Sequence, residues 1–285
     1  MTVAYLVLLV LTAVWGLTFP LVQSALAFAS PLVFVALRFA LATVVFALLV
    51  WPRAFRLSRE LLWKGAWLGL LLSGGFAFQT FGLVHTTAAR SGFLTGTLVP
   101  MTPLFAWLLF RIHVGLRPWL AVALAFAGTA VMSQPESGGF NLGDALTLGG
   151  AACFALQVVF VNRWATPQNA VQLTWVQILV TCVLATLVIP LEGPRLDLSP
   201  LLFWALVITA VAGTALGIWG QLHFQPRITA TAAAIIYAFE PVFAGIAAWM
   251  MLGLVPGQST LLGAGLIFCG MILSSISPKI KPEIP

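Results

Sequence analysis

The chain has 285 residues, of which 61% are hydrophobic and 7% are charged, and its formal net charge is +6. A soluble globular domain carries roughly 25% charged residues, so this chain has too few polar groups to cover one. The composition therefore predicts an integral membrane protein and excludes an ordinary soluble globular protein.

The first apolar stretch covers residues 3–24 and has to be distinguished from a secretory signal. A cleavable signal has a basic segment before an apolar core of ~7–15 residues. No Lys or Arg precedes this stretch, and it is longer than such a core. We therefore expect it to be a retained membrane span.

Further apolar stretches follow along the chain, each near the ~20 residues that a helix needs to cross a bilayer. With the first, they lie at about 3–24, 31–50, 62–84, 88–110, 117–134, 142–163, 170–190, 200–221, 227–252 and 258–276. The sequence predicts an all-helical membrane protein with ten transmembrane helices and no separate soluble domain.

The basic residues between these stretches predict the orientation. With a cytoplasmic N-terminus, ten of the 13 basic residues lie on the cytoplasmic side, and only Arg90 and Arg195 lie outside. Such an excess marks the cytoplasmic face of membrane proteins. Both termini are therefore expected in the cytoplasm, and the positive charge reflects orientation in a cell inner membrane rather than nucleic-acid binding.

The two halves of the sequence resemble each other. The segment TPLFAWLLF at 102–110 matches EPVFAGIAA at 240–248, 138 positions later, and FGLVH at 81–85 matches WGQLH at 219–223 at the same spacing. Farther upstream the spacing is 139, which aligns Arg38 with Gln177. We expect two repeats, residues 1–135 and 140–278. Five spans in each force the second repeat into the membrane upside down, as in many secondary transporters that bind substrate at the repeat interface.

These motifs resemble those of the drug/metabolite transporter superfamily, specifically its two-repeat EamA type. The resemblance rests on VWG at 14–16, LRF at 37–39, TPLF at 102–105 and EPVF at 240–243, and it covers essentially the whole chain. It implies ten helices around a central cavity, and it extends to the YddG-like amino-acid exporters. Some of those exporters carry an aromatic residue before the proline of TPLF, where this chain has Thr102.

The residues suggest how such a cavity is lined. Three pairs, each three positions apart, place an aromatic and a polar group on one helix face. With the amide of Gln79 and with Thr102, they give the predicted substrate-binding set: Trp15, Thr18, Gln79, Thr102, Phe154, Gln157, Tyr237 and Glu240. Aromatic walls with a few polar groups suit a small amphipathic solute. No metal or cofactor is expected.

Arg38 and Glu240 are charged residues within apolar spans. At ~1.5 Å per residue they lie at similar depth in the outer half of the membrane, and charged groups there seek partners. An ion pair that gates or braces the outer half is one hypothesis. Direct contact of Glu240 with a substrate amine and a proton-carrying site at Glu240 are the others.

Three functions remain open. Alternating-access export of amino acids, including aromatic and apolar ones, or of similar metabolites is the leading hypothesis. Proton-coupled efflux of drugs or organic cations is the second, and a non-transport membrane sensor is the alternative from another class. The chain has no HExxH or GxSxG motif and no P-loop, so we expect neither an enzyme nor a nucleotide-driven pump. The expected partners are a small-molecule substrate and the bilayer, with the protein working as a monomer.

Overall fold

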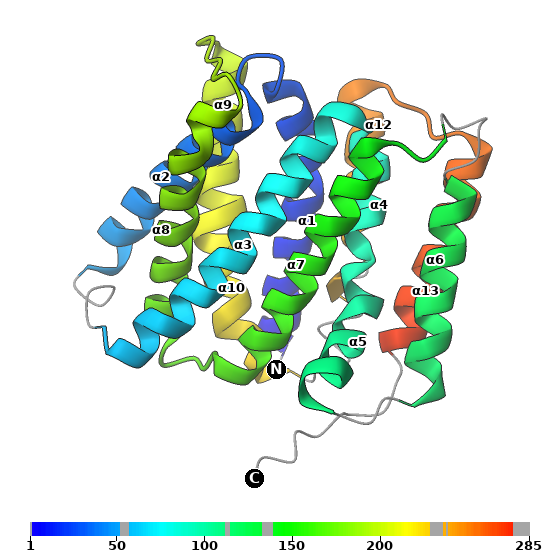
Figure 1. Ribbon diagram of the computed structural model, residues 1–285, viewed down its shortest axis with the longest axis horizontal. Helices are drawn as coiled ribbons and strands as arrows, with labels where there is room; N and C mark the ends of the chain where they lie inside the picture. The colour runs from blue at the N-terminus through cyan, green and yellow to red at the C-terminus, as the bar shows by residue number, and fades with distance from the viewer. Residues whose placement is uncertain are drawn as a thin grey trace.

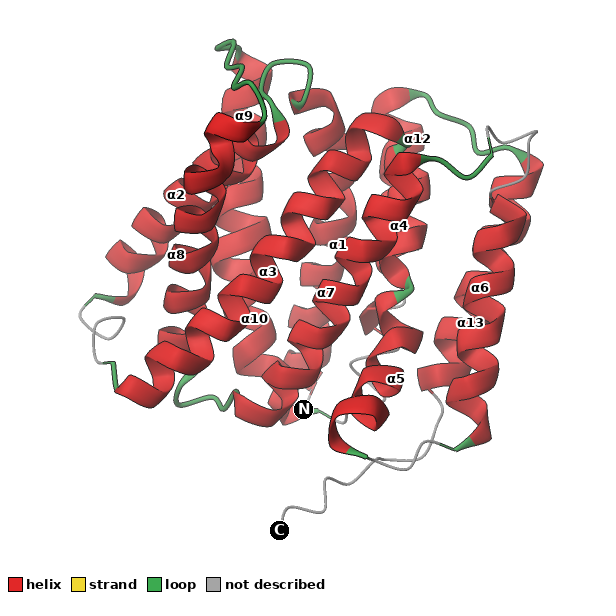
Figure 2. Ribbon diagram, viewed as in Figure 1, coloured by secondary structure: helices red, strands yellow, loops and turns green. Residues whose placement is uncertain are grey.

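The computed structural model describes residues 2–51, 57–111, 115–132, 139–228, 236–237 and 239–275 (Figures 1 and 2). Within these ranges the chain is helical, and the sole β-type contact is one isolated bridge between Ala29 and Leu196. The all-helical membrane class predicted from the sequence is confirmed.

The first half of the chain forms six helical segments. They are α1 (Thr2–Ala25), α2 (Pro31–Val50), α3 (Arg59–His85), α4 (Ala88–Gly96), α5 (Leu98–Phe110) and α6 (Leu116–Met132). The second half contributes α7 (Leu142–Trp164), α8 (Ala170–Val188), η3 (Ile189–Leu191), α9 (Pro200–Ile208), η4 (Thr209–Leu216), α10 (Gly217–Phe224), η5 (Gln225–Arg227), α12 (Glu240–Leu252) and α13 (Gln258–Ser275).

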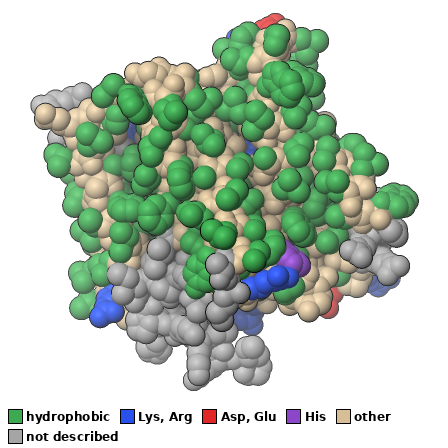
Figure 3. Space-filling model, turned by 180° about the vertical axis from the view of Figure 1, so that it is seen from behind, with side chains coloured by type: hydrophobic (Ala, Val, Ile, Leu, Met, Phe, Trp, Pro, Cys, Tyr) green, Lys and Arg blue, Asp and Glu red, His purple; other side chains and the backbone are tan. Residues whose placement is uncertain are grey.

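Seven helices among the described residues are long and apolar enough to cross a membrane, and three apolar helices are shorter. The shorter ones are Trp119–Gly128, Glu240–Leu252 and Gln258–Leu273. Of the apolar stretch predicted at 227–252, only α12 is described as a long helix, so ten spanning helices stays a prediction. Figure 3 shows apolar side chains spread over the outer surface, as expected for a surface that contacts lipid.

The helices alternate in direction across the bundle (Figure 1). The start of α3 and the ends of α5 and α7 lie at the lower end, where they place the basic residues Arg59, Lys64, Arg111 and Arg163. The turns after α3 and α8 lie at the opposite end. This distribution agrees with the basic face used above to predict orientation, and the orientation itself stays a prediction.

α6 and α13 pack against each other at one side of the bundle (Figure 1). A Cβ atom at Gly128 would lie 2.5 Å from the carbonyl oxygen of Gly263, and one at Gly270 would lie 2.7 Å from that of Ala121. Gly128 and Gly270 occupy corresponding places in the two halves of the sequence. A glycine at the equivalent position of each repeat therefore lets α6 and α13 approach each other's backbone closely.

The α4–α5 helix is interrupted inside the bundle. α4 ends at Gly96, and the hydroxyl of Thr97 donates to the carbonyl of Leu94 at 2.6 Å, which closes a tight turn. Pro100 has no N–H to continue the α-helical ladder back to Gly96. α5 therefore starts anew beside the central helices, close to Thr95.

Candidate functional site

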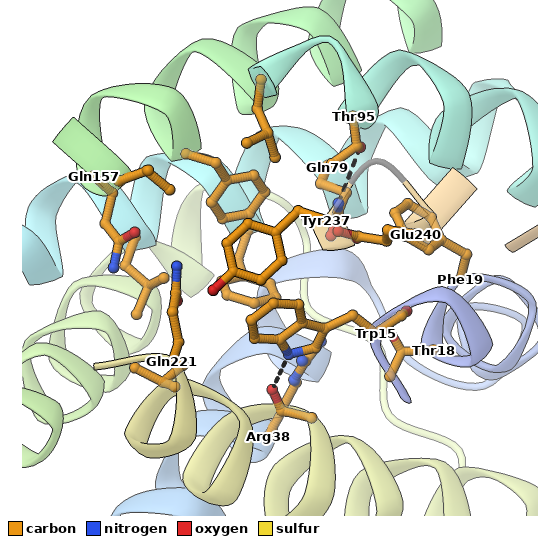
Figure 4. Close-up of a pocket in the computed structure, with 17 residues that line it drawn as sticks. Trp15, Thr18, Phe19, Arg38, Gln79, Thr95, Gln157, Gln221, Tyr237 and Glu240 are labelled. Atoms are coloured by element: carbon orange, nitrogen blue, oxygen red, sulfur yellow. Dashed lines mark hydrogen bonds between the residues drawn. The ribbon is translucent and has the colours of Figure 1, made fainter. Parts of the chain in front are cut away.

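A cavity lies among α1, α2, α3, α4, the start of α5, α7, η4, α10 and α12 (Figure 4). Its volume is about 80 Å³, which is less than the ~300–1,000 Å³ of pockets that enclose a drug-sized ligand, so the cavity is narrow in this conformation. Both halves of the chain contribute to its walls.

Seven of the eight predicted substrate-binding residues line this cavity, and so does Arg38. The seven are Trp15, Thr18, Gln79, Phe154, Gln157, Tyr237 and Glu240. Thr102 is not among the lining residues; its hydroxyl donates to the carbonyl of Leu98, one turn earlier, at 2.7 Å. The structure thus brings seven of the residues together, and their role in binding stays a prediction.

Trp15 and Phe154, which correspond in the two repeats, are held in related ways. The indole Nε1 of Trp15 donates to the carbonyl of Gly213 at 2.8 Å. The ring of Phe154 packs so closely on α3 that a Cβ at Gly75 would lie 2.4 Å from it. Gly75 and Gly213 are 138 positions apart, the spacing of the repeat. Each aromatic side chain therefore lies against the matching glycine of the other half.

The aromatic wall includes two further rings. Tyr237 lies 5.9 Å from Trp15 between ring centroids, and its hydroxyl donates to Gln225 at 3.0 Å. Phe76 packs edge to face on Phe154 at 5.3 Å. Such contacts fix the orientation of the rings, so the wall is preformed.

Several polar groups of the cavity are partly used by the protein itself. The hydroxyl of Thr18 donates to the carbonyl of Trp15 at 2.6 Å. The amide of Gln157 donates to Gln177 at 3.1 Å, and the amide of Gln79 donates to Thr95 at 3.2 Å. An amide has two donors and an acceptor oxygen, so the glutamines keep hydrogen-bonding capacity beyond these contacts.

The segment η4 is π-helical, packs against α2 and contributes Gly213 to the cavity wall. The hydroxyl of Thr214 donates to the carbonyl of Thr209 at 2.9 Å, five residues earlier, and accepts a hydrogen bond of 2.7 Å from Nε of Arg38. Runs of π-helix are rare and occur frequently at functional sites. Here the π-helical geometry presents the Gly213 carbonyl and the Thr214 hydroxyl to α1 and α2.

Arg38 is 3% exposed and borders the cavity. Its Cζ lies 4.5 Å from the centroid of the Phe76 ring, so the guanidinium rests on an aromatic face. The ion pairs within the described residues are Lys64–Glu60, Arg90–Asp144 and Arg195–Asp197. The predicted pair of Arg38 with Glu240 is thus not formed in this conformation, and it stays a prediction for another one.

Glu240 is 9% exposed and is the first residue of α12. α1 passes close to it, since a Cβ at Gly16 would lie 2.9 Å from its carbonyl oxygen. A helix N-terminus stabilises a nearby negative charge. Among the described side chains none donates a hydrogen bond to this carboxylate, which lines the cavity.

Other lining residues were not predicted from the sequence: Phe19, Leu72, Phe76, Thr95, Leu98, Val158, Gly213, Ile218 and Gln221. Phe76 lies three positions before Gln79, so the aromatic-polar spacing used for the other pairs could have identified it. The remaining residues have no distinguishing signal in the sequence.

A second polar cluster lies outside the cavity, where α3 and α4 meet the start of α7. Arg90 donates to Asp144 at 2.5 Å and to the carbonyl of Gly139 at 2.8 Å. Asp144 also accepts from Thr86 at 3.0 Å and forms a capping box with Asn141. Arg90 was expected at the membrane face as an orientation signal, but it is 5% exposed and joins the two halves of the chain.

Comparison with known proteins decides the family. Residues 2–134 and 141–276 both match the EamA-like transporter family. The chain belongs to the EamA-like transporter family. This confirms the resemblance found in the sequence and identifies the protein as a transporter rather than an enzyme. It is a multi-pass protein of the cytoplasmic membrane.

Individual relatives agree with this assignment. An uncharacterized transporter of Archaeoglobus fulgidus is 29% identical, over 92% of this chain and 82% of its own. An S-adenosylmethionine uptake transporter of Rickettsia bellii is 24% identical, over 74% of this chain and 72% of its own. A solved crystal structure has a TM-score of 0.70 at 20% identity and covers 96% of each chain, which shows a shared fold.

Proposed function

We propose that this EamA-family transporter exports small amphipathic metabolites, foremost amino acids, with aromatic and apolar ones among them. Transport proceeds by alternating access between two inverted repeats, residues 1–135 and 140–278. Each repeat contributes five of ten spanning helices, and both termini lie in the cytoplasm. The monomer works without a nucleotide or a cofactor, and its specificity is of the YddG-like kind.

The observation that carries this proposal is the composition of the cavity wall. Trp15, Phe76, Phe154 and Tyr237 supply aromatic surface, while Gln79 and Glu240 supply polar and charged groups. Pockets of this kind bind ligands with an apolar body and a few polar groups, and the polar contacts fix the orientation. An amino acid with an apolar side chain has this structure, whereas a sugar or a phosphate does not.

Two features support the alternating-access part. Trp15 and Phe154 lie against matching glycines of opposite halves, as two repeats related by an axis in the membrane plane would place them. In addition, the α4–α5 helix is interrupted at Thr97, and α12 starts inside the bundle at Glu240. Interrupted helices surround the substrate sites of many repeat-built transporters.

The second candidate is proton-coupled efflux of organic cations. It is favoured by the Glu240 carboxylate, which lines the cavity and accepts no hydrogen bond from any described side chain. Membership of a transporter family argues against the membrane sensor. S-adenosylmethionine, named for the Rickettsia bellii relative, contains an amino-acid group and fits the proposed class. That relative is named for uptake, so the direction in which this protein transports its substrate has to be measured.

Transport by the purified protein in liposomes tests the proposal. Liposomes preloaded with unlabelled amino acid should accumulate labelled phenylalanine, leucine or methionine by exchange, with no nucleotide present. Glu240→Gln should reduce this exchange, while Glu60→Gln, at an exposed pair with Lys64, should not. Movement of cationic dyes alone, abolished by Glu240→Gln and driven by a pH gradient, would favour the second candidate. A folded protein that moves none of these compounds would refute the proposal.

A further inference from the structure

Arg38 is a buried cation in a membrane span. It is 3% exposed, it lies inside α2, and no acidic side chain of the described chain lies within ion-pair distance of it. A charged group in such a place is costly, and residues of this kind usually pair with an opposite charge or mark the path of a substrate. The burial of Arg38 without an acidic partner among the described residues therefore needs a physical explanation.

The protein holds this guanidinium from one side. Nε donates to Thr214 at 2.7 Å, and Cζ lies over the ring of Phe76, 4.5 Å from its centroid. Thr214 is itself oriented by its hydrogen bond to the Thr209 carbonyl within η4. The two terminal nitrogens of Arg38 make no hydrogen bond to a described residue. Arg38 is thus fixed in position while its terminal N–H groups remain available to the cavity that it lines (Figure 4).

A guanidinium presents parallel N–H donors that match the two oxygens of a carboxylate. Trp15 packs beside it, with its indole bonded to Gly213 in the same π-helical segment as Thr214. A ligand with an apolar or aromatic group and a carboxylate could therefore pack on Trp15 and bind Arg38 at the same time. A substrate carboxylate at this point would also provide the negative charge that the burial of Arg38 demands.

We propose that Arg38, positioned by Thr214 and Phe76, is the carboxylate-binding subsite of the cavity. This inference rests on the proposed function and deepens it. The cavity selects substrates that carry a carboxylate, and Glu240, on the same cavity, takes the ammonium group of a zwitterion. A compound with an amine alone satisfies only Glu240, and a compound with a carboxylate alone satisfies only Arg38.

Three ligands that differ by one group test the subsite: phenylalanine, phenethylamine without the carboxylate, and 3-phenylpropionate without the ammonium. Their affinities are measured on detergent-purified wild type, Arg38→Gln, Arg38→Lys and Thr214→Val. Charge-assisted hydrogen bonds of this kind change affinity by about tenfold or more. Arg38→Gln should weaken phenylalanine and 3-phenylpropionate by at least that factor and leave phenethylamine nearly unchanged.

The conservative variants sharpen the result. Arg38→Lys keeps the positive charge but lacks the parallel N–H donors of a guanidinium, so it should bind phenylalanine more tightly than Arg38→Gln does and less tightly than wild type. Thr214→Val should lower the affinity for phenylalanine more than the affinity for phenethylamine. Arg163→Gln is the matched control, because Arg163 also rests on an aromatic ring, at 4.7 Å from Phe110, away from the cavity. It should leave all three affinities unchanged.

The outcomes separate this inference from the proposed function. If wild type binds phenethylamine as tightly as phenylalanine, or Arg38→Gln weakens all three ligands equally, the carboxylate subsite is refuted while transport of amphipathic solutes stands. If wild type binds and moves none of the panel, both fail. Should Arg38→Gln not fold, the preference of wild type among the three ligands and the response of Thr214→Val decide the question.

Discussion

Arg38 and Arg90 are both buried in the helix bundle, yet their surroundings differ. Arg90 donates to Asp144 and to the Gly139 carbonyl, in a cluster that includes Thr86 and the capping box of α7. Among the described residues, Arg38 donates one side-chain hydrogen bond, to Thr214, and lies over the rings of Phe76 and Phe39. The difference separates a charge that the protein neutralises for its own stability from a charge that it leaves for a ligand.

The two sites also differ in what they join. The Arg90 cluster ties the turn between α3 and α4 to the first turn of α7, and so connects the two halves of the chain at one end. The Arg38 site lies at the centre, on walls built from both halves. We therefore expect changes at the first site to affect folding and changes at the second to affect binding.

The largest effect is expected from Asp144→Asn. It removes the carboxylate that pairs with the buried Arg90, and breaking a buried ion pair by removing one partner costs about 3–5 kcal/mol in other proteins. The thermal unfolding midpoint of the purified protein should fall sharply, or the yield of folded protein should collapse. Glu60→Gln, at the exposed pair with Lys64, should leave the midpoint unchanged. Equal midpoints for wild type and Asp144→Asn would show that the cluster is not a stabilising contact.

Gly16→Ala tests the wall that carries Glu240. The new Cβ would lie 2.6 Å from Cβ of Phe243 and 2.8 Å from the Ala244 nitrogen, so α1 and α12 must separate. Overpacking of this kind costs about 1–3 kcal/mol of folding free energy, and transport should fall with it. Gly265→Ala in α13, where a Cβ meets nothing within 4 Å, is the control. Normal stability and transport in Gly16→Ala would contradict the close packing.

Trp15→Ala and Phe154→Ala test whether the repeat-related aromatics contact substrate. Each should weaken ligand binding by about 1–2 kcal/mol, as loss of a buried aromatic contact does. The measurement is equilibrium binding of labelled phenylalanine to purified protein. Trp204→Ala removes a ring that is 59% exposed on the outer surface and should leave affinity unchanged. If both cavity variants bind normally, these rings serve packing alone.

Arg38→Met is expected to have the smallest effect on stability, and Arg90→Met is the contrasting variant. Arg38→Met removes a buried charge that has no described acidic partner, so the unfolding free energy should stay within about 1 kcal/mol or rise. Arg90→Met removes the cationic partner of Asp144, which is fully buried, and should lower the thermal unfolding midpoint strongly. Thermal unfolding of the two variants side by side gives the answer. Similar losses in both would mean that Arg38 is also a structural residue.

Much of the fold was predictable from the sequence, since membrane helices must be apolar over their length and the repeat is preserved in spacing. Trp15 and Phe154, like Thr18 and Gln157, were singled out because the repeat offset places each pair at equivalent positions. Pro100 is a helix-breaking signal in the sequence, but it does not show that α4 already ends at Gly96. The π-helical turn at Thr214 was not found, because it lies in an apolar run that is compatible with a regular helix. The Arg90–Asp144 pair joins residues 54 positions apart, so only tertiary packing reveals it.

The π-helical segment η4 has a consequence for helical register. Hydrogen bonds to the fifth residue fit an additional residue into the turn, and one residue corresponds to about 100° of rotation in an α-helix. The face that α10 turns toward the cavity, with Ile218 and Gln221, is therefore set by the number of residues in Thr209–Leu216. Loss of a single residue there would rotate both side chains out of the cavity while leaving every apolar residue of the span in an apolar environment. Chain length in this segment, and not only side-chain chemistry, thus determines what a substrate meets.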